Sequence, residues 1–233
     1  MMFDPALMMI TLVFMGIGMF VSSRLKRKFS EYSQTPISSG LSGKEVAEKM
    51  LRDNGIMDVK IISVEGQLTD HYNPLEKTVN LSSEVFQGRN IASAAVAAHE
   101  CGHAVQHAHA YSWLSLRSAI VPVVNISSKM MNFIFIAAFI FGAMYHWYNQ
   151  MLGLIIVCQG MITAFSLITL PVELDASKRA LVWLDSARIT RGDEHEKAKD
   201  ALNWAAKTYF VAALASLAQL MYFIMLFLGR KRD

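Results

Sequence analysis

Residues 5–22, PALMMITLVFMGIGMFVS, form an uncharged stretch that decides the class of fold. At a helical rise of about 1.5 Å per residue, a run of this length roughly covers the hydrocarbon core of a bilayer. Asp4 precedes the stretch and Arg24, Lys26 and Arg27 follow it, which is opposite to the charge order of a secretory signal peptide. The stretch therefore predicts an uncleaved transmembrane anchor whose C-terminal end lies in the cytoplasm.

Three further apolar stretches follow, at residues 119–143, 151–172 and 208–229. Of the 233 residues, 53% are hydrophobic and 18% are charged, whereas about 25% is usual for the charged fraction of a soluble domain. The sequence thus predicts a mainly α integral membrane protein with about four transmembrane helices in the lipid bilayer. The net charge of +3 is small and the basic residues cluster beside apolar runs, which argues against nucleic acid as a partner.

Most of the charge lies in two polar segments, residues 24–118 and 173–207. The connection at 144–150 has no Lys or Arg, whereas the segment 173–207 has seven. By the positive-inside rule, we expect both polar segments on the cytoplasmic side. Four complete crossings would place the basic tail at 230–232 on the opposite side, against the same rule, so the direction of the last span stays open.

We expect five parts along the chain. They are an N-terminal anchor at 1–23, a catalytic segment at 24–118, two transmembrane helices at 119–172, a polar segment at 173–207, and a C-terminal helix with a basic tail at 208–233.

The first polar segment predicts a small α+β unit. SGLSGKEVAEKMLRDNG at 39–55 has the spacing of a short amphipathic helix, and IASAAVAAHECGHAVQHAHA at 91–110 has that of a longer one. Between them, VKIISV at 59–64 and TVNLS at 78–82 read as strands of a small sheet or hairpin. The second strand either offers an edge to an extended substrate or belongs to an ordinary structural hairpin.

The longer helix carries His99-Glu100-Cys101-Gly102-His103, an HExxH sequence. Two His residues four positions apart lie one turn apart on the same helical face and can bind one Zn²⁺ ion. Glu100 lies beside the first ligand and can act as the general base. The motif predicts a catalytic zinc site in a zincin-like unit.

A catalytic zinc needs a third protein ligand, and two further His residues lie close in sequence. His107 continues the four-residue series, but at about 12 Å along the helix from His99 it cannot share one ion with it. His109 has the spacing of the metzincin pattern, although Gln106 stands where that pattern has the Gly that lets the helix turn.

Glu173 is the preferred third ligand, because a carboxylate at the end of an apolar span usually has a partner inside the protein. The alternative is an interfacial carboxylate paired with Lys178 or Arg179. Both polar segments are expected on the same membrane side, so Glu173 can reach the HExxH helix.

Three stretches together resemble a known family. HECGHAVQ at 99–106, PVELDASKRA about seventy residues later at 171–180, and DHYNPLEKTVNLS at 70–82 are similar to the YugP-like neutral zinc metallopeptidases of bacterial membranes. The resemblance implies a bacterial cytoplasmic-membrane peptidase, with His99, His103 and Glu173 as zinc ligands and Glu100 as the catalytic base.

More distantly, the chain is similar to the HtpX-type membrane proteases. In that pattern an Asp follows the Glu ligand by four residues and supports a zinc-bound His. Here Ser177 stands at that position and the Asp lies at 175 instead.

The expected reaction is zinc-dependent hydrolysis of peptide bonds in a protein or peptide substrate, with Glu100 taking and returning the proton. Four residues are candidates for a further donor to the oxyanion: His71, Tyr72, Tyr111 and His195. The sequence indicates no oligomeric state.

Two rival functions remain open. One is an intramembrane protease of the site-2 type, in which the zinc helix lies in the bilayer and an Asp, here Asp175, supplies the third ligand. The other is a non-enzymatic scaffold or transporter in which the HExxH motif binds metal structurally or not at all, so that Glu100 is catalytically silent.

Overall fold

The computed structural model describes residues 4–141 and 148–229, so the basic tail at 230–233 and much of the connection at 144–150 lie outside the described residues. The chain divides into two compact units. The span unit comprises Met1–Phe20, Leu116–Leu170 and Thr208–Asp233, and the site unit comprises Val21–Ser115 and Pro171–Lys207.

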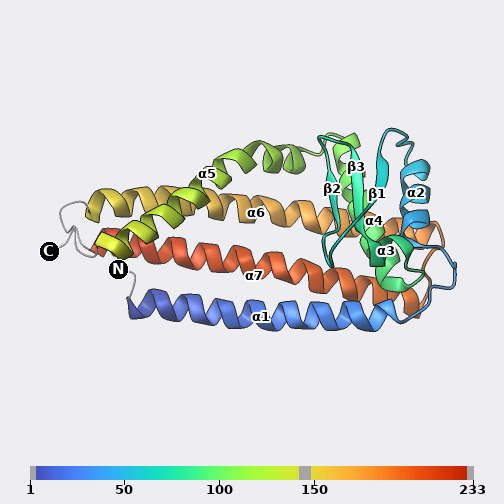
Figure 1. Ribbon diagram of the computed structural model, residues 1–233, viewed down its shortest axis with the longest axis horizontal. Coiled ribbons are helices and arrows are strands. Elements are labelled where there is room, and N and C mark those ends of the chain that lie inside the picture. The colour runs from blue at the N-terminus through green and yellow to red at the C-terminus, as the bar shows by residue number, and fades with distance from the viewer. Residues whose placement is uncertain (1–3, 142–147, 230–233) are drawn as a thin grey trace. The chain divides into compact units, whose positions relative to one another are not determined.

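Long helices dominate the described chain (Figure 1). They are α1 (Pro5–Ser33), α5 (Ser112–Phe141), α6 (Tyr148–Ser186) and α7 (Asp193–Gly229). By length and composition, four stretches can cross a membrane: Pro5–Ser33, Ser112–Ala137, Met151–Ser186 and Asp193–Gly229. The prediction of a mainly α membrane protein with four transmembrane helices and a small α+β unit is confirmed.

Helix α6 continues well beyond the predicted span at 151–172 and ends at Ser186. The reason is a second apolar series at helical spacing, in which Ala180, Trp183 and Leu184 are buried in the core of the site unit. The extension keeps Glu173 inside a continuous helix.

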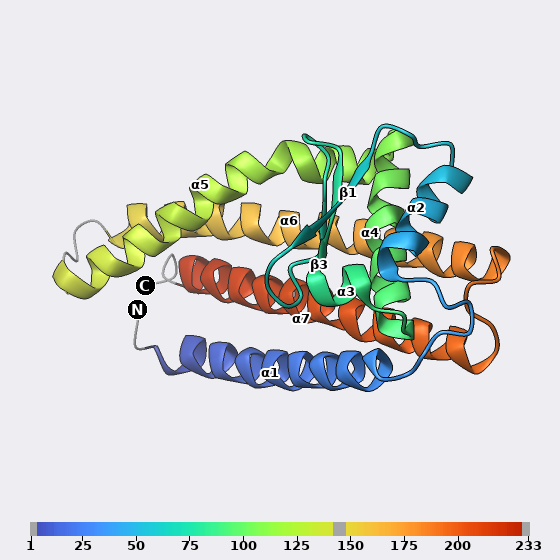
Figure 2. The same ribbon diagram turned by 45° about the vertical axis from the view of Figure 1, so that its right-hand side comes forward.

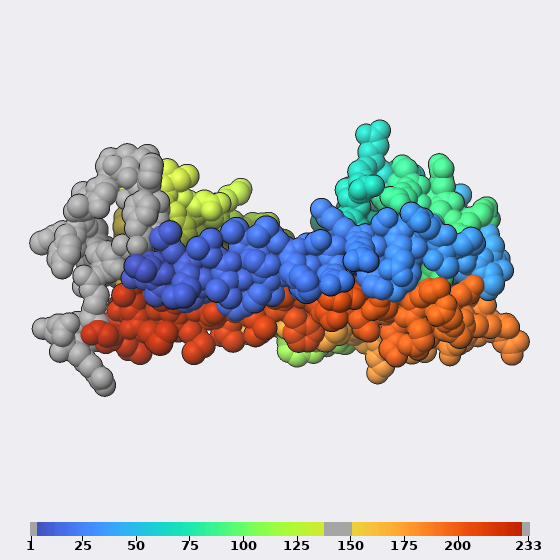
Figure 3. All heavy atoms as spheres, turned by 90° about the horizontal axis from the view of Figure 1, so that it is seen from below, coloured from blue at the N-terminus to red at the C-terminus, as the bar shows by residue number. Residues whose placement is uncertain are grey.

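The span unit exposes apolar side chains on the outer faces of its helices. Figure 3 shows α1 (blue) lying along the C-terminal part of α7 (red), and within α1 the exposed apolar residues include Met8, Met9, Leu12 and Met19. In the interior, the amide of Gln159 donates to the Ser216 carbonyl at 3.1 Å. Apolar side chains on the outside and polar contacts between helices on the inside are typical of helices that pack in a bilayer.

The site unit contains a three-stranded sheet made of β1 (Lys60–Val64), β2 (His71–Asn73) and β3 (Thr78–Ser82). The strand order is β1-β3-β2, with β1 parallel and β2 antiparallel to β3. Since β3 is the central strand and all its residues are buried, the structure excludes the first of the two alternatives for TVNLS, a free edge, and leaves the structural hairpin, which β3 forms with β2. The edges belong to β1 and β2.

Two helices pack closely in the site unit, α2 (Gly43–Asp53) and α4 (Ile91–Ala108), as Figure 2 shows. A capping box fixes the start of α2: Ser42 Oγ accepts from the Glu45 N–H, and the Glu45 carboxylate accepts from the Ser42 N–H. Six alanines of α4 are buried, and their small side chains let neighbouring elements approach the helix backbone. The short α3 (Ser83–Gln87) completes this packing.

Candidate metal centre

Helix α4 carries both His residues of the HExxH sequence on one face. Its first turn is capped by Asn90, whose side chain accepts a hydrogen bond of 2.8 Å from the Ser93 N–H. The rings of His99 and His103 are 4.9 Å apart between centroids and nearly perpendicular, at 84°. The two Nε2 atoms therefore converge on one region beside the helix.

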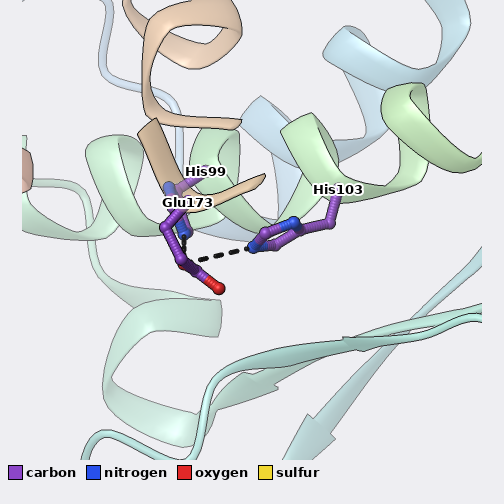
Figure 4. A group of neighbouring side chains, drawn as sticks. All are labelled: His99, His103 and Glu173. Carbon is purple, nitrogen blue, oxygen red and sulfur yellow. Dashed lines mark ion pairs between the residues drawn. The ribbon is translucent and has the colours of Figure 1, made fainter. Parts of the chain in front are cut away.

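Glu173 of α6 meets the two His side chains there (Figure 4). Its Oε2 atom lies 3.3 Å from His99 Nε2 and 3.6 Å from His103 Nε2. The side chain of Glu173 is only 3% exposed. One ligand atom from each of the three residues lies within 4.8 Å of the others, and no further group of this kind is found among the described residues.

The donor set fits zinc. Two imidazoles and one carboxylate are a usual protein set for catalytic zinc, which keeps a fourth position open. With metal–ligand distances of about 2.1 Å, tetrahedral geometry places neighbouring ligand atoms about 3.4 Å apart. The observed separations of 3.3 and 3.6 Å bracket this value.

Gly102 permits the close approach of α4 and α6. A Cβ atom at this position would lie 2.6 Å from the Ala176 carbonyl oxygen and 3.2 Å from the Ala176 Cα. Any side chain would push the backbone of α6 away, and Glu173 lies less than one turn from Ala176. The glycine inside the HExxH sequence thus sets how closely Glu173 approaches the two His residues.

Each His ring also has a partner on its other nitrogen. His99 Nδ1 lies 3.1 Å from Ser177 Oγ, and His103 Nδ1 lies 3.0 Å from Gln106 Oε1. Such contacts orient imidazole ligands so that Nε2 faces the metal. Ser177, which stands where the HtpX-type pattern has an Asp, thus contacts His99. No pattern in the sequence predicted the contact between Gln106 and His103.

Glu100 is buried beside these residues and is 8% exposed. Burial raises the pKa of its carboxyl to about 7, against the opposing effect of His99. The charge of Asp70 raises this pKa further, and the charge of His71 lowers it.

The other ligand candidates lie outside the group. His107 is exposed, and its Nδ1 is 2.8 Å from the Tyr72 hydroxyl. His109 is the C-cap of α4 and is exposed. Asp175 accepts from Gln106 Nε2 at 2.8 Å and Arg179 Nε at 2.5 Å.

The oxyanion candidates are spread over the site unit. His71 Nδ1 is 2.8 Å from the Thr69 carbonyl oxygen, and the ring of Tyr111 lies beneath the Arg179 guanidinium at 5.7 Å. His195 Nδ1 is 3.1 Å from Thr190 Oγ1. The charge of His71 lowers the pKa of Glu100, which links this candidate to the site.

Comparison with known proteins agrees with this geometry. The model of a family described as "Putative neutral zinc metallopeptidase" matches residues 7–228. The chain is 39% identical over 224 residues to a protein of Bacillus subtilis (strain 168) named "Putative membrane protease YugP", and the match covers 96% of this chain and 97% of that protein. No solved structure matches the chain. With a family match over nearly its whole length, the chain belongs to the neutral zinc metallopeptidase family.

Proposed function

We propose that the protein is a membrane-bound, zinc-dependent endopeptidase in which His99, His103 and Glu173 hold the metal and Glu100 is the general base. The observation that carries the proposal is the convergence of two Nε2 atoms and one carboxylate oxygen from α4 and α6, at separations of 3.3 and 3.6 Å. These separations match a tetrahedral zinc site.

Zinc, when bound, supplies a Lewis acid that activates a water molecule and polarises the scissile carbonyl. The two His rings contribute neutral donors, and Glu173 contributes the one negative charge of the ligand set. Glu100 follows His99 directly in the helix and is buried with the ligands, so its carboxylate takes the proton of the attacking water. It then delivers this proton to the leaving amine.

The structure gives no support to an intramembrane enzyme of the site-2 type. Helix α4 is not among the four candidate spans of the described chain, and Asp175 bonds to Gln106 and Arg179 instead of joining the ligand group. The site unit also places strand β3 and helix α2 in one hydrophobic core with α4. The zinc helix is therefore proposed to lie in a small domain outside the bilayer.

We further propose that this domain lies on the cytoplasmic side of a bacterial cytoplasmic membrane. The support is the distribution of Lys and Arg: residues 24–28 follow the first span, and seven basic residues lie between 173 and 207. The parts proposed from the sequence at 1–23, 24–118, 119–172, 173–207 and 208–233 then alternate between membrane and cytoplasm.

The test uses the full-length protein in detergent, with zinc content and hydrolysis of an unstructured protein substrate measured together. Glu100→Gln should keep zinc and lose at least 100-fold in kcat, since general base catalysis contributes about 10²–10⁴-fold. Glu173→Ala should lose both zinc and activity. Glu76→Gln, at an exposed glutamate, is the matched control and should change neither.

Full activity in Glu100→Gln would overturn the mechanism. A wild-type protein that binds zinc but cleaves no substrate would instead support the non-enzymatic scaffold or transporter.

A further inference from the structure

We propose that Gln106 is a positioning residue of the metal centre. It selects the nitrogen of His103 that faces the metal, and it ties His103 to the part of α6 that carries Glu173. The inference rests on the proposed function, because it concerns the same ligand set.

All three observed hydrogen bonds of the Gln106 amide are made with these two elements. Its Nε2 donates to the Val172 carbonyl oxygen and to Asp175 Oδ2, both at 2.8 Å, and its Oε1 lies 3.0 Å from His103 Nδ1. The side chain is fully buried. Because a rotated amide would set its oxygen against two acceptors, the contacts fix which end is oxygen and which is nitrogen.

The orientation of the amide determines the tautomer of His103. Oε1 of Gln106 can only accept, so the proton of a neutral His103 ring must be on Nδ1. The lone pair is then on Nε2, which lies 3.6 Å from Glu173 Oε2. His103 is thereby preset to bind metal through the nitrogen that faces Glu173.

The same amide links two ligands that come from different helices. Val172 precedes Glu173 directly, and Asp175 follows it by two residues. Movement of this turn of α6 relative to α4 would break hydrogen bonds of a buried amide, and an unsatisfied buried polar group is costly. Gln106 thus holds the distance between His103 and Glu173.

Asp175 is itself held in place. Its Oδ2 also accepts from Arg179 Nε, and the Arg179 guanidinium lies over the ring of Tyr111. Asp175 therefore supports His103 indirectly, through the amide of Gln106. The imidazole of His103 thus contacts the neutral amide of Gln106. The negative charge of Asp175 contacts that amide and not the imidazole.

The first test is the affinity for zinc, measured on the full-length protein in detergent by competition with a chromogenic chelator. Gln106→Met keeps similar length without hydrogen bonds and should raise the zinc dissociation constant about 10- to 100-fold. Val105→Ala, at the buried neighbouring residue on α4, is the matched control for loss of packing and should change it less than threefold. A dissociation constant in Gln106→Met within threefold of the wild type would overturn the proposal.

A second pair of variants covers the case in which Gln106→Met does not fold, as judged by circular dichroism and gel filtration. Gln106→Glu alone sets a carboxylate against Asp175 and should weaken zinc binding. In the double variant with Asp175→Asn, an amide donor at position 175 faces the new carboxylate at position 106. The zinc dissociation constant of the double variant should be at least tenfold lower than that of the single variant. Wild-type affinity in the single variant, or no recovery in the double variant, would contradict the proposal.

Measurement of zinc affinity distinguishes the proposed role of Gln106 from the proposed peptidase reaction. Zinc binding that depends on Gln106, in a protein without peptidase activity, would refute only the proposed function. Absence of zinc binding in the wild type would refute both.

Discussion

Substitution of Gly102 by Ala tests whether the distance between α4 and α6 controls the metal centre. The added Cβ would lie 2.6 Å from the Ala176 carbonyl oxygen. Reaching 3.0 Å, the shortest tolerable separation, requires a shift of 0.4 Å, and an ordinary contact at 3.4 Å requires 0.8 Å. Metal–ligand distances tolerate about ±0.2 Å, so the required shift is roughly two to four times this tolerance.

We therefore expect Gly102→Ala to raise the zinc dissociation constant at least tenfold, or about 1.4 kcal/mol. Thermal stability is a weaker readout, because overpacking costs about 1–3 kcal/mol while the change from Gly to Ala in a helix returns about 1 kcal/mol. The assay is chelator competition in detergent.

Gly160→Ala is the matched control, since a Cβ on this α6 glycine meets no described atom within 4 Å. The control should bind zinc as the wild type does. A zinc affinity of Gly102→Ala within twofold of the wild type would refute the reasoning.

The partner of His99, two helix caps and the metal itself can each be tested separately. Ser177→Ala removes the partner of His99 Nδ1 and should weaken zinc binding about tenfold by chelator competition; unchanged affinity would show that the contact orients nothing. Asn90→Ala removes the N-cap of α4 and should cost about 1 kcal/mol, or about 2–4 °C in Tm by calorimetry, while Asn90→Asp should keep the cap and the Tm. The hydrogen bond from the Ser42 N–H holds the pKa of Glu45 at about 2, below its usual 4.5, so this carboxylate stabilises the fold above pH 4.5 and the contribution is lost as the pH falls toward 2. Glu45→Gln should accordingly lower the Tm at pH 7 and have a smaller effect at pH 3, and an equal effect at both would contradict the assignment. Removal of metal by a strong chelator should abolish peptidase activity and added Zn²⁺ should restore it, whereas activity that survives full zinc removal would exclude a metallopeptidase.

Patterns local in sequence were sufficient for much of the fold. The length and apolar composition of the uncharged run at 5–22 predicted a membrane helix, and the Ala-rich run at 91–110 predicted the helix that carries His99 and His103. The position of Glu173 at the end of an apolar run, on the same predicted membrane side, singled it out as a ligand candidate, and the structure brings it to the two His residues.

Features that depend on contacts between residues far apart in the chain could not be predicted from the sequence. Strand β2 is only three residues long, and it exists as a strand because it pairs with β3, which in turn makes β3 central. Two of the three partners of Gln106, Val172 and Asp175, lie 66 and 69 residues along the chain, so their contacts with the glutamine leave no local pattern. The close contact that requires Gly102 likewise becomes visible only when Ala176 is placed against it.

The identity of the zinc ligands is the central claim, and X-ray absorption spectroscopy at the zinc edge tests it most directly. The wild-type protein loaded with one equivalent of Zn²⁺ should show only nitrogen and oxygen neighbours at about 2.0–2.1 Å, with the outer-shell scattering of two imidazoles. A sulfur neighbour at about 2.3 Å, or the scattering of one imidazole or none, would contradict a centre built from His99, His103 and Glu173.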